Sequence, residues 1–385
     1  SGIGVIEIAK RTTRVLVRGK DTALFVGRKT GLLYFARTEG AGVWEQQTPT
    51  QVFTIAPTGG RPRKVAEIAR GSIGSINADE TLLLGAVAER DFKLETGPRD
   101  PRFDAAYAAT GPDGRPLTFA DAKEVRLKAR AEARIPMEMF VVDLGSGEQR
   151  TIHSSTAWLN HLQFSPVDPQ LVMFCHEGPW HGVDRIWSIR LGDREPRLVH
   201  RRMMNMEIAG HEFFGVDGKT LWYDLQTPRG EVFWLAKAQP DGSDRHWYEV
   251  ARDHWSVHYN VAPDGSFFAG DGGDAEMVAR ASDGKWLYLF WPETMADIAG
   301  ISVPNASELV RPGKLRAARL VDMSAHDYRM EPNVIFTRDS KWVIFRSNMH
   351  GDAHVYMAEV ATSGPPVGRA SARQGDVGLK SDPQE

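Results

Sequence analysis

The chain has 385 residues, with 47 Lys and Arg against 50 Asp and Glu, which gives a formal net charge of −3. This near-balance argues against a dedicated nucleic-acid binder, and no apolar run reaches the roughly 18 residues that a membrane span needs. The single cysteine, Cys175, excludes an internal disulfide framework and a cysteine-based zinc finger.

Short β-rich runs separated by polar turns recur along the chain. Turns that begin at Ser165, Val216 and Ala262 are about 45–50 residues apart, and this spacing, with about four strands per unit, is typical of a β-propeller blade. Six such units can be counted, and the opening stretch 4–17 resembles the outer half of another. We therefore predict an all-β, seven-bladed β-propeller with a helical insertion, and six blades as the alternative.

The propeller is predicted to occupy residues 1–361, interrupted by a charged insertion at 91–136. Within the insertion, residues 122–135 predict one helix that ends before Pro136. The insertion is either a surface decoration or a lid over one end of the propeller. Residues 362–385 contain Gly, Pro and Ser but no aromatic residue, and we expect a disordered tail.

Histidines are unevenly distributed, and nine of the 12 lie between positions 153 and 258. The first cluster, 175–181, follows a strand and suits a carbohydrate-binding rim; alternatively, its polar groups satisfy buried backbone atoms in a tight turn. Residues at strand ends further along the chain are candidates as well, because a propeller brings strand ends from every blade to one central funnel. The candidate substrate-binding residues are His176, Trp180, His181, His211 and Tyr259.

The stretch 254–260 has the pattern of a channel-lining strand. Alternation places Ser256, His258 and Asn260 on one face, and a neutral histidine there is a natural general base near pH 7. Arg229 lies in a strand-end turn, where its side chain either points into the funnel or is simply solvated. His258 and Arg229 are thus the candidate catalytic residues.

A second polar cluster occupies positions 326–333. His326, Glu331 and Asn333 offer nitrogen and oxygen ligands for a divalent metal such as Mn²⁺, although such residues also form plain hydrogen-bond networks.

Four stretches, 175–187, 210–224, 254–273 and 326–351, resemble the oligogalacturonate lyase family of polysaccharide lyases. The resemblance covers the chain from about Gly27 to Val360. It implies a seven-bladed propeller that cleaves pectin oligomers by β-elimination, with a histidine base and a Mn²⁺ site. By resemblance the base corresponds to His258, a substrate-facing arginine to Arg229 and one metal-binding histidine to His326.

The chain departs from this family at residues 328–333. Better-known members carry Gln and two closely spaced His there, and Glu331 and Asn333 stand as replacements for histidine ligands in this chain. Because of this difference, the substrate can be a uronate-containing sugar other than oligogalacturonate. The resemblance also implies an N-terminal half-blade that this chain does not contain.

Two other functions are compatible with the residues alone. One is a non-catalytic, TolB-like propeller that binds a protein or a sugar. The other is a glycoside hydrolase, which needs two carboxylates at a defined separation, and no such pair stands out. The expected partner is a uronate oligosaccharide, and the expected location is bacterial cytoplasm or periplasm.

Overall fold

The computed structural model describes residues 2–38, 47–92, 110–117, 119–272, 284–296, 303–328 and 330–360. These residues belong to two compact units, Ser1–Arg201 and Arg202–Glu385. The expected tail and residues 93–109 of the insertion lie outside the described part of the chain. No helix among the described residues is both long and apolar enough to cross a membrane.

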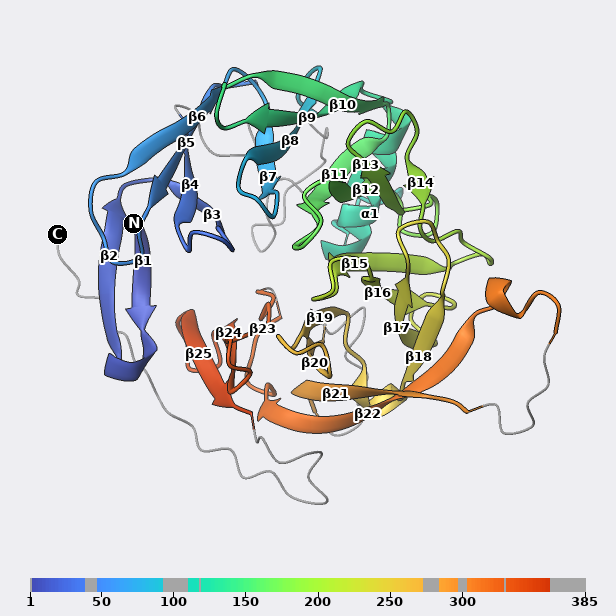
Figure 1. Cartoon of the computed structure of the whole chain (residues 1–385). Helices are drawn as coiled ribbons and strands as arrows, with labels where there is room; N and C mark the ends of the chain where they lie inside the picture. The colour runs from blue at the N-terminus through green and yellow to red at the C-terminus, as the bar shows by residue number, and fades with distance from the viewer. Residues whose placement is uncertain are drawn as a thin grey trace. The chain divides into compact units, whose positions relative to one another are not determined.

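The first unit consists of one two-stranded hairpin and three four-stranded antiparallel sheets (Figure 1). Each sheet is an up-and-down meander, which is the arrangement of a propeller blade. The strands are β1 Gly2–Glu7, β2 Thr12–Arg18, β3 Thr22–Val26, β4 Leu33–Thr38, β5 Thr50–Ile55, β6 Arg63–Ile68, β7 Ser72–Ile76, β8 Leu82–Ala88, β9 Met137–Asp143, β10 Gln149–Ser155, β11 Trp158–Phe164, β12 Leu171–Glu177, β13 Ile186–Arg190 and β14 Arg197–Leu198.

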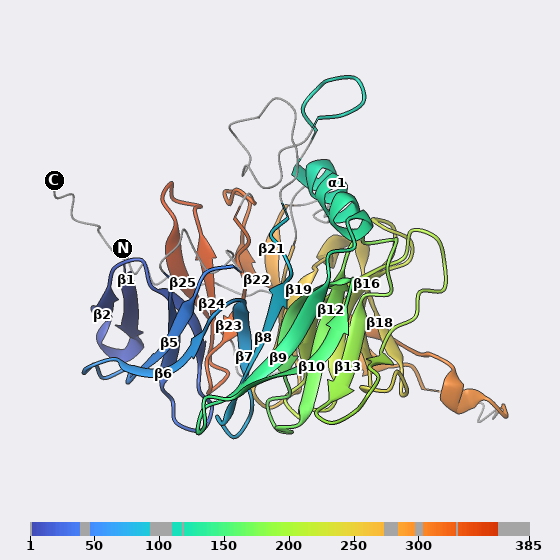
Figure 2. The same cartoon turned by 90° about the horizontal axis from the view of Figure 1, so that it is seen from above.

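Within the described ranges there is one α-helix, α1 (Phe119–Glu132), which lies between β8 and β9, in the segment where the sequence predicts a helix. Figure 2 shows α1 across one end of the strands of this unit. The guanidinium groups of Arg126 and Arg130 lie 5.1 and 5.6 Å from the centroid of the Trp158 ring at the start of β11. The helix therefore covers one end of the β11–β14 blade.

The second unit contains an eight-stranded sheet and a three-stranded sheet. The eight-stranded sheet consists of two meanders, β15–β18 and β19–β22, which join where the outer strand β18 pairs in parallel with the outer strand β22. The strands are β15 Ile208–Phe214, β16 Leu221–Gln226, β17 Phe233–Ala238, β18 His246–Val250, β19 His258–Val261, β20 Phe268–Asp271, β21 Trp286–Thr294, β22 Arg311–Asp322, β23 Ile335–Phe336, β24 Trp342–Ser347 and β25 His354–Glu359.

Close contact at the β18–β22 junction depends on a glycine. A Cβ atom at Gly313 would overlap the ring of Tyr248, its partner in the parallel pair, and would also lie 2.8 Å from the carbonyl oxygen of Glu293. Any other residue would push the two outer strands apart.

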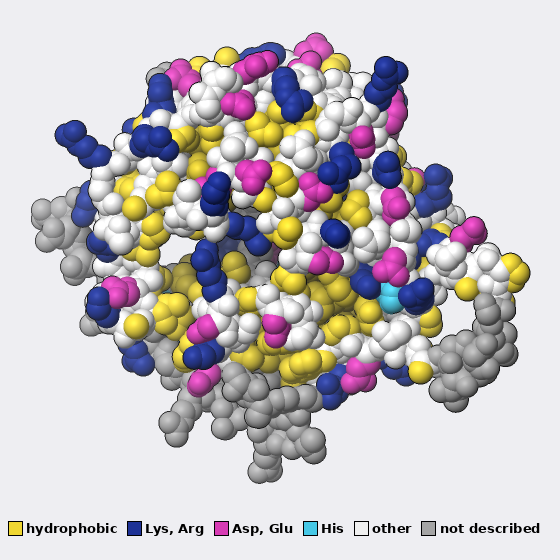
Figure 3. Space-filling view, viewed as in Figure 1, with side chains coloured by type: hydrophobic (Ala, Val, Ile, Leu, Met, Phe, Trp, Pro, Cys, Tyr) yellow, Lys and Arg dark blue, Asp and Glu magenta, His cyan; other side chains and the backbone are white. Residues whose placement is uncertain are grey.

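The hydrophobic cores lie between successive blades within each unit. Strands β8 and β12 are buried along almost their whole length because a neighbouring sheet covers each face, and their sequences are correspondingly apolar. In the second unit, aromatic rings such as Phe233, Tyr288 and Phe290 fill the space between the β15–β18 and β19–β22 blades. The chain is therefore all-β, with blade-like sheets, and charged side chains of both signs intermingle over the face in Figure 3.

Candidate functional site

Two neighbouring blades of the second unit repeat the same histidine–aspartate pair. His211 of β15 contacts Asp224 of β16, and His258 of β19 contacts Asp271 of β20. Each pair is separated by 13 residues, and each Nδ1 lies 2.7 Å from an aspartate Oδ1. Both aspartates are buried, so each carboxylate holds an imidazole in a fixed orientation with Nε2 directed away from it.

The two imidazoles are also neighbours, with ring centroids 4.3 Å apart in an edge-to-face arrangement. Their environments differ, because the side chain of His211 is 40% exposed and that of His258 only 16%. A bulge between Gly210 and Phe213 gives His211 a positive φ of 49°. Bulges of this kind redirect a side chain at the rim of a sheet, and here the result is a histidine accessible from solvent.

Charge distinguishes the two histidines further. Burial alone would lower the pKa of His258, but the carboxylates of Asp271, Glu331 and Asp224 outweigh burial and raise it to about 9. The Nε2 atom of His258 lies 4.0 Å from Oε1 of Glu331. His258 is therefore cationic at neutral pH in this environment, and a protonated imidazole cannot accept a proton.

His326, predicted as a metal ligand, has a hydrogen-bond partner at each ring nitrogen in this structure. This side chain is 3% exposed; its Nδ1 lies 2.8 Å from Oγ of Ser347, and its Nε2 lies 2.7 Å from the carbonyl oxygen of Met330. Both ring nitrogens are thus engaged in hydrogen bonds. Burial also lowers the pKa of His326, as expected for a neutral histidine inside the fold.

The two other predicted ligands lie on an exposed turn that leads into β23. The backbone of this turn is held by Arg346, whose Nε donates to the carbonyl oxygen of Glu331 at 2.7 Å. The Glu331 side chain is 55% exposed, and Asn333 is exposed, with its Nδ2 3.4 Å from the same carbonyl oxygen. The Glu331 carboxylate of this turn approaches His258, whose Nε2 lies 4.0 Å from its Oε1.

His258 and Glu331 together offer an imidazole nitrogen and a carboxylate oxygen, a donor combination that suits Mn²⁺. One further observation fits a cation at this place. The Oδ2 atom of Asp271 is buried and has no hydrogen-bond partner among the described residues, so one oxygen donor behind His258 is unused.

Arg229 is connected to the first histidine pair through its own turn. It follows the cis peptide bond Thr227–Pro228, and its backbone N–H donates to the carbonyl oxygen of Met206 at 2.7 Å. The next residue, Gly230, donates to Oε1 of Gln226, whose Nε2 lies 3.5 Å from Oδ2 of Asp224. The half-buried Arg229 is therefore fixed at the same end of the blade as His211.

Two of the predicted substrate-binding residues, Tyr259 and His176, pack against other rings in this structure. The ring of Tyr259 is 8% exposed, lies in the core between blades and donates from its hydroxyl to the carbonyl oxygen of Ser256 at 2.9 Å. His176 packs against Trp187 with a centroid separation of 4.9 Å, and against Phe174. Strand alternation places these rings on faces that contact neighbouring sheets.

The other two, Trp180 and His181, lie in the loop after β12, in the first unit. The ring of Trp180 lies 5.2 Å from Nζ of Lys123 on α1, and both Trp180 and His181 are half-buried. They remain accessible to a ligand at this end of the blade.

The pKa of His176 gives a testable consequence for stability. Burial, with a smaller contribution from His153, lowers this pKa from 6.5 to about 4. The unfolded chain therefore binds a proton between pH 6.5 and 4 that the folded chain does not, so stability falls as the pH falls through this window. We expect His176→Phe to reduce the acid destabilisation by ~2 kcal/mol, measured as the free energy of urea unfolding at pH 7 and 4.5. Equal pH dependence in His176→Phe and in the surface control His350→Phe would contradict this.

The first unit also contains a buried cluster of ion pairs that the sequence did not predict. Glu177 accepts hydrogen bonds from Nη1 of Arg185 and Nδ2 of Asn160, each at 3.0 Å, and its Oε2 lies 3.6 Å from Nε2 of His161. Burial would raise the pKa of Glu177, but Arg185 and His161 lower it to about 2.

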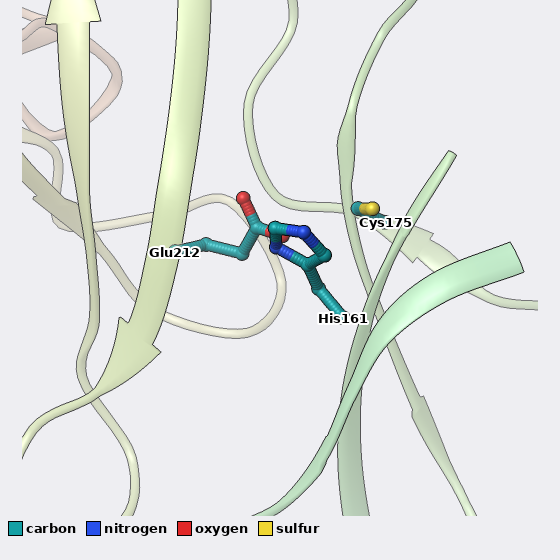
Figure 4. A group of neighbouring side chains, drawn as sticks. All are labelled: His161, Cys175 and Glu212. Carbon is teal, nitrogen blue, oxygen red and sulfur yellow. The ribbon is translucent and has the colours of Figure 1, made fainter. Parts of the chain in front are cut away.

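Figure 4 shows His161 on β11 and Cys175 on the neighbouring strand β12; Sγ of Cys175 lies 3.8 Å from Oε2 of Glu177. His161 has the same φ of 49° as His211 and likewise lies in a bulge of the first strand of its blade. A histidine beside an acidic residue of the second strand therefore occurs in three successive blades. The equal spacing of the two His–Asp pairs was a signal in the sequence that could have identified Asp224 and Asp271.

Comparison with known proteins identifies the relatives of this chain. A family model described as oligogalacturonate lyase matches residues 120–364. The chain is 29% identical over 231 residues to an oligogalacturonide lyase of Pectobacterium atrosepticum and 28% identical over 231 residues to an oligogalacturonate lyase of Dickeya dadantii. Each match covers 58% of this chain and 55% of the relative, so the chain spans about half the length of these curated relatives.

Solved structures of the same kind share the fold. An oligogalacturonate lyase in complex with manganese superposes with a TM-score of 0.66 at 21% identity, covering 94% of this chain and 83% of the other. An oligogalacturonate lyase from Vibrio parahaemolyticus gives a TM-score of 0.50 at 19% identity, covering 90% and 100%. The resemblance seen in the sequence is confirmed, since the family model covers more than half of the chain: this protein belongs to the oligogalacturonate lyase family.

Proposed function

We propose that this protein cleaves uronate-containing oligosaccharides, with oligogalacturonate as the first candidate, by β-elimination, and that its sheets are blades of a seven-bladed propeller. The observation that carries the proposal is the pair of adjacent imidazoles, His211 and His258, each oriented by a buried aspartate. Family membership supports the substrate class, and the curated relatives are named for oligogalacturonate or oligogalacturonide.

β-Elimination removes the proton on C5 of a uronate and expels the oxygen on C4. The C5 proton is weakly acidic, so a site must supply a base and must also neutralise the carboxylate next to C5, where negative charge develops. The two histidines offer these two functions separately, because His211 is the more exposed ring and His258 is buried beside Glu331.

We assign the base to His211. Its Nδ1 is held by Asp224 at 2.7 Å, which leaves Nε2 as the proton-accepting atom on the more exposed of the two rings. The residue favoured by the sequence, His258, is the less suitable base because neighbouring carboxylates raise its pKa to about 9. His258 is the alternative base, and the variants His211→Ala and His258→Ala distinguish the two assignments.

We assign His258, Glu331 and Asn333 to a divalent metal site, with Mn²⁺ as the candidate ion; His258 would have to lose its proton to bind the ion, so binding would release a proton. When bound, the ion supplies positive charge that stabilises the uronate carboxylate and the enolate-like charge formed on loss of the C5 proton. Asp271 orients His258 for this role, as carboxylates behind metal-bound histidines commonly do. Arg229 is the proposed second carboxylate clamp, and Trp180 and His181 are proposed sugar contacts in the first unit.

The activity is tested by the absorbance near 235 nm of unsaturated uronate products. We expect a rise with di- and trigalacturonate in the presence of Mn²⁺, and no rise with saturated neutral oligosaccharides of the same length. Absence of a rise on galacturonate, glucuronate, mannuronate and guluronate oligomers would reject the lyase function and favour a binding propeller.

The metal assignment makes its own prediction. Glu331→Ala removes a charged oxygen donor, so we expect the Mn²⁺ concentration for half-maximal activity to rise about tenfold or more, since loss of a ligand or its support commonly lowers metal affinity by this amount. Isothermal titration of EDTA-treated protein with Mn²⁺ measures the same change without turnover. An unchanged Mn²⁺ affinity in Glu331→Ala, with Glu359→Ala as the surface control, would remove Glu331 from the site.

A further inference from the structure

The exposed turn that leads into β23 is fixed through its backbone by β24. Nε of Arg346 donates to the carbonyl oxygen of Glu331 at 2.7 Å, and the backbone N–H of Arg346 donates to the carbonyl oxygen of Pro332 at 3.0 Å. One residue of the neighbouring strand therefore holds two consecutive carbonyl groups of the turn. These contacts fix the backbone at Glu331 and do not use its carboxylate oxygens.

A third carbonyl group of the turn, that of Met330, is held by a histidine. Its oxygen lies 2.7 Å from Nε2 of His326. A carbonyl oxygen can only accept, so Nε2 carries the ring proton, and Nδ1 accepts from the hydroxyl of Ser347 at 2.8 Å. His326 is 3% exposed and Ser347 is fully buried, so both hydrogen bonds are shielded from water. His326 thus connects the end of β24 to the residue before Glu331.

The conformation of the turn is restricted as well. Glu331 precedes a proline, which disfavours the helical region for its backbone and favours an extended one. Asn333 has a φ of 53°, in the left-handed region that asparagine adopts more readily than most residues. Pro332 and Val334 are buried, whereas Glu331 and Asn333 are exposed. The two side chains with oxygen donors are therefore both directed away from the core.

The strand that carries His258 also anchors the chain just after this turn. His258 and Asn260 are two residues apart in β19 and so lie on the same face of that strand. Oδ1 of Asn260 accepts from the backbone N–H of Phe336 in β23 at 2.9 Å. Since β19 and β23 belong to different sheets, this side chain connects the two sheets. The imidazole of His258 and the carboxylate of Glu331 are therefore positioned from the same strand.

We propose that His326, Arg346 and Asn260 are positioning residues for the metal site, and we refer to them as the ligand-turn brace. The inference rests on the proposed function for the metal site, and on the hydrogen bonds above for the brace. A turn that is already ordered loses less conformational freedom when Glu331 and Asn333 bind an ion, so the brace raises metal affinity. It gives His326 a role at the site although both of its ring nitrogens have hydrogen-bond partners.

The test measures the Kd for Mn²⁺ by isothermal titration of EDTA-treated protein. His326→Phe keeps a buried ring but removes both hydrogen bonds, and Asn260→Ala removes the acceptor for Phe336; neither changes the charge of a neutral side chain. We expect the Kd to rise about 10- to 100-fold in each, because partners that orient metal ligands commonly contribute this much.

Arg346→Met gives a result whose sign is informative. Removal of a positive charge beside a cation site would by itself strengthen Mn²⁺ binding. Weaker binding in this variant therefore identifies the loss of positioning rather than an electrostatic effect, and weaker binding is the expected result. Arg346 is exposed, so this variant leaves the core intact even if His326→Phe does not fold.

A spectroscopic signature and a matched control separate positioning from general stability. The electron paramagnetic resonance spectrum of bound Mn²⁺ reports the arrangement of its ligands and should change in the brace variants. Thr337→Ala alters the other end of the β23–β24 hairpin, where the Thr337 hydroxyl contacts Asp339 at 2.6 Å. This control should lower the Tm but leave both the Kd and the spectrum unchanged.

The outcomes for the brace and for the lyase function are distinct. An unchanged Kd and an unchanged spectrum in the folded brace variants would overturn the proposal, whatever happens to the Tm, and so would the absence of Mn²⁺ binding in the unmodified protein. Weaker Mn²⁺ binding in the variants, without any absorbance rise near 235 nm in the unmodified protein, would reject the lyase function and leave the brace standing.

Discussion

Replacing His211 with alanine should lower kcat on digalacturonate by about 10²- to 10⁴-fold, which is the usual contribution of a positioned general base. The expectation follows from the half-exposed ring, the 2.7 Å contact with Asp224 and the cationic state of its neighbour His258. Asp224→Asn should give a smaller loss, because it leaves His211 in place but removes the carboxylate that fixes its orientation and tautomer. The initial rate of the absorbance rise near 235 nm at saturating Mn²⁺ measures both effects.

His258→Ala should respond differently. If His258 holds the metal, its variant should lose Mn²⁺ affinity in calorimetric titrations, whereas His211→Ala should bind Mn²⁺ normally. His350→Ala, on the turn between β24 and β25, serves as the surface control and should keep full activity. Near-normal activity in His211→Ala, together with an inactive His258→Ala that still binds Mn²⁺, would return the base to His258, as the sequence indicates.

Arg185→Met should destabilise the protein by about 3–5 kcal/mol, the effect of leaving a buried charge without its partner. Glu177 is buried and accepts 3.0 Å hydrogen bonds from Arg185 and Asn160, so removal of the guanidinium leaves a carboxylate inside the blade with one strong donor fewer. Urea unfolding at pH 7, followed by circular dichroism, measures the change. Glu177→Gln with Arg185→Met in one chain should recover most of the loss, because neither charge then remains buried.

Acid provides a second readout of the same pair. The pKa of Glu177 in the folded chain is about 2, below its ordinary value of 4.5, so its contribution to stability is complete above pH 4.5 and is lost as the pH falls from 4.5 toward 2. The matched control is Arg190→Met in the same blade, whose side chain is 49% exposed and lies 2.7 Å from Asp168. That variant should lose less than about 1 kcal/mol. A similarly small loss in Arg185→Met would show that the buried pair contributes no more than a surface one.

The strands and turns of the fold could be predicted from the sequence because the patterns that specify them are local. Polar turns such as 165–169 and 262–265 alternate with β-rich runs, and each run became a strand of a blade-like sheet. The helix was likewise predictable, since 122–135 is rich in helix-forming residues and ends before a proline.

The site was only partly accessible, because its contacts join distant segments. The sequence identified His211, His258 and Glu331 as polar residues near strand ends, and the structure brings them into one unit with Asp224 and Asp271 behind the histidines. The sequence could not show that both ring nitrogens of His326 have hydrogen-bond partners, since these partners are the Ser347 hydroxyl and a backbone carbonyl oxygen. Strand alternation also cannot tell which face of a blade meets a neighbouring sheet, so the packing of Tyr259 and His176 was not visible in the sequence.

The parallel pairing of β18 with β22 has a consequence for how the second unit holds its shape. Strands at the outside of a sheet normally expose unpaired N–H and C=O groups, which invite pairing with another chain. Here the residues His246–Glu249 use that edge to bond with Arg311–Lys314, more than sixty positions later. The two blades that carry the histidines are thereby parts of one continuous hydrogen-bonded sheet. Local opening of one blade therefore also disturbs the other, and neither blade can move independently to change the spacing of the two imidazoles.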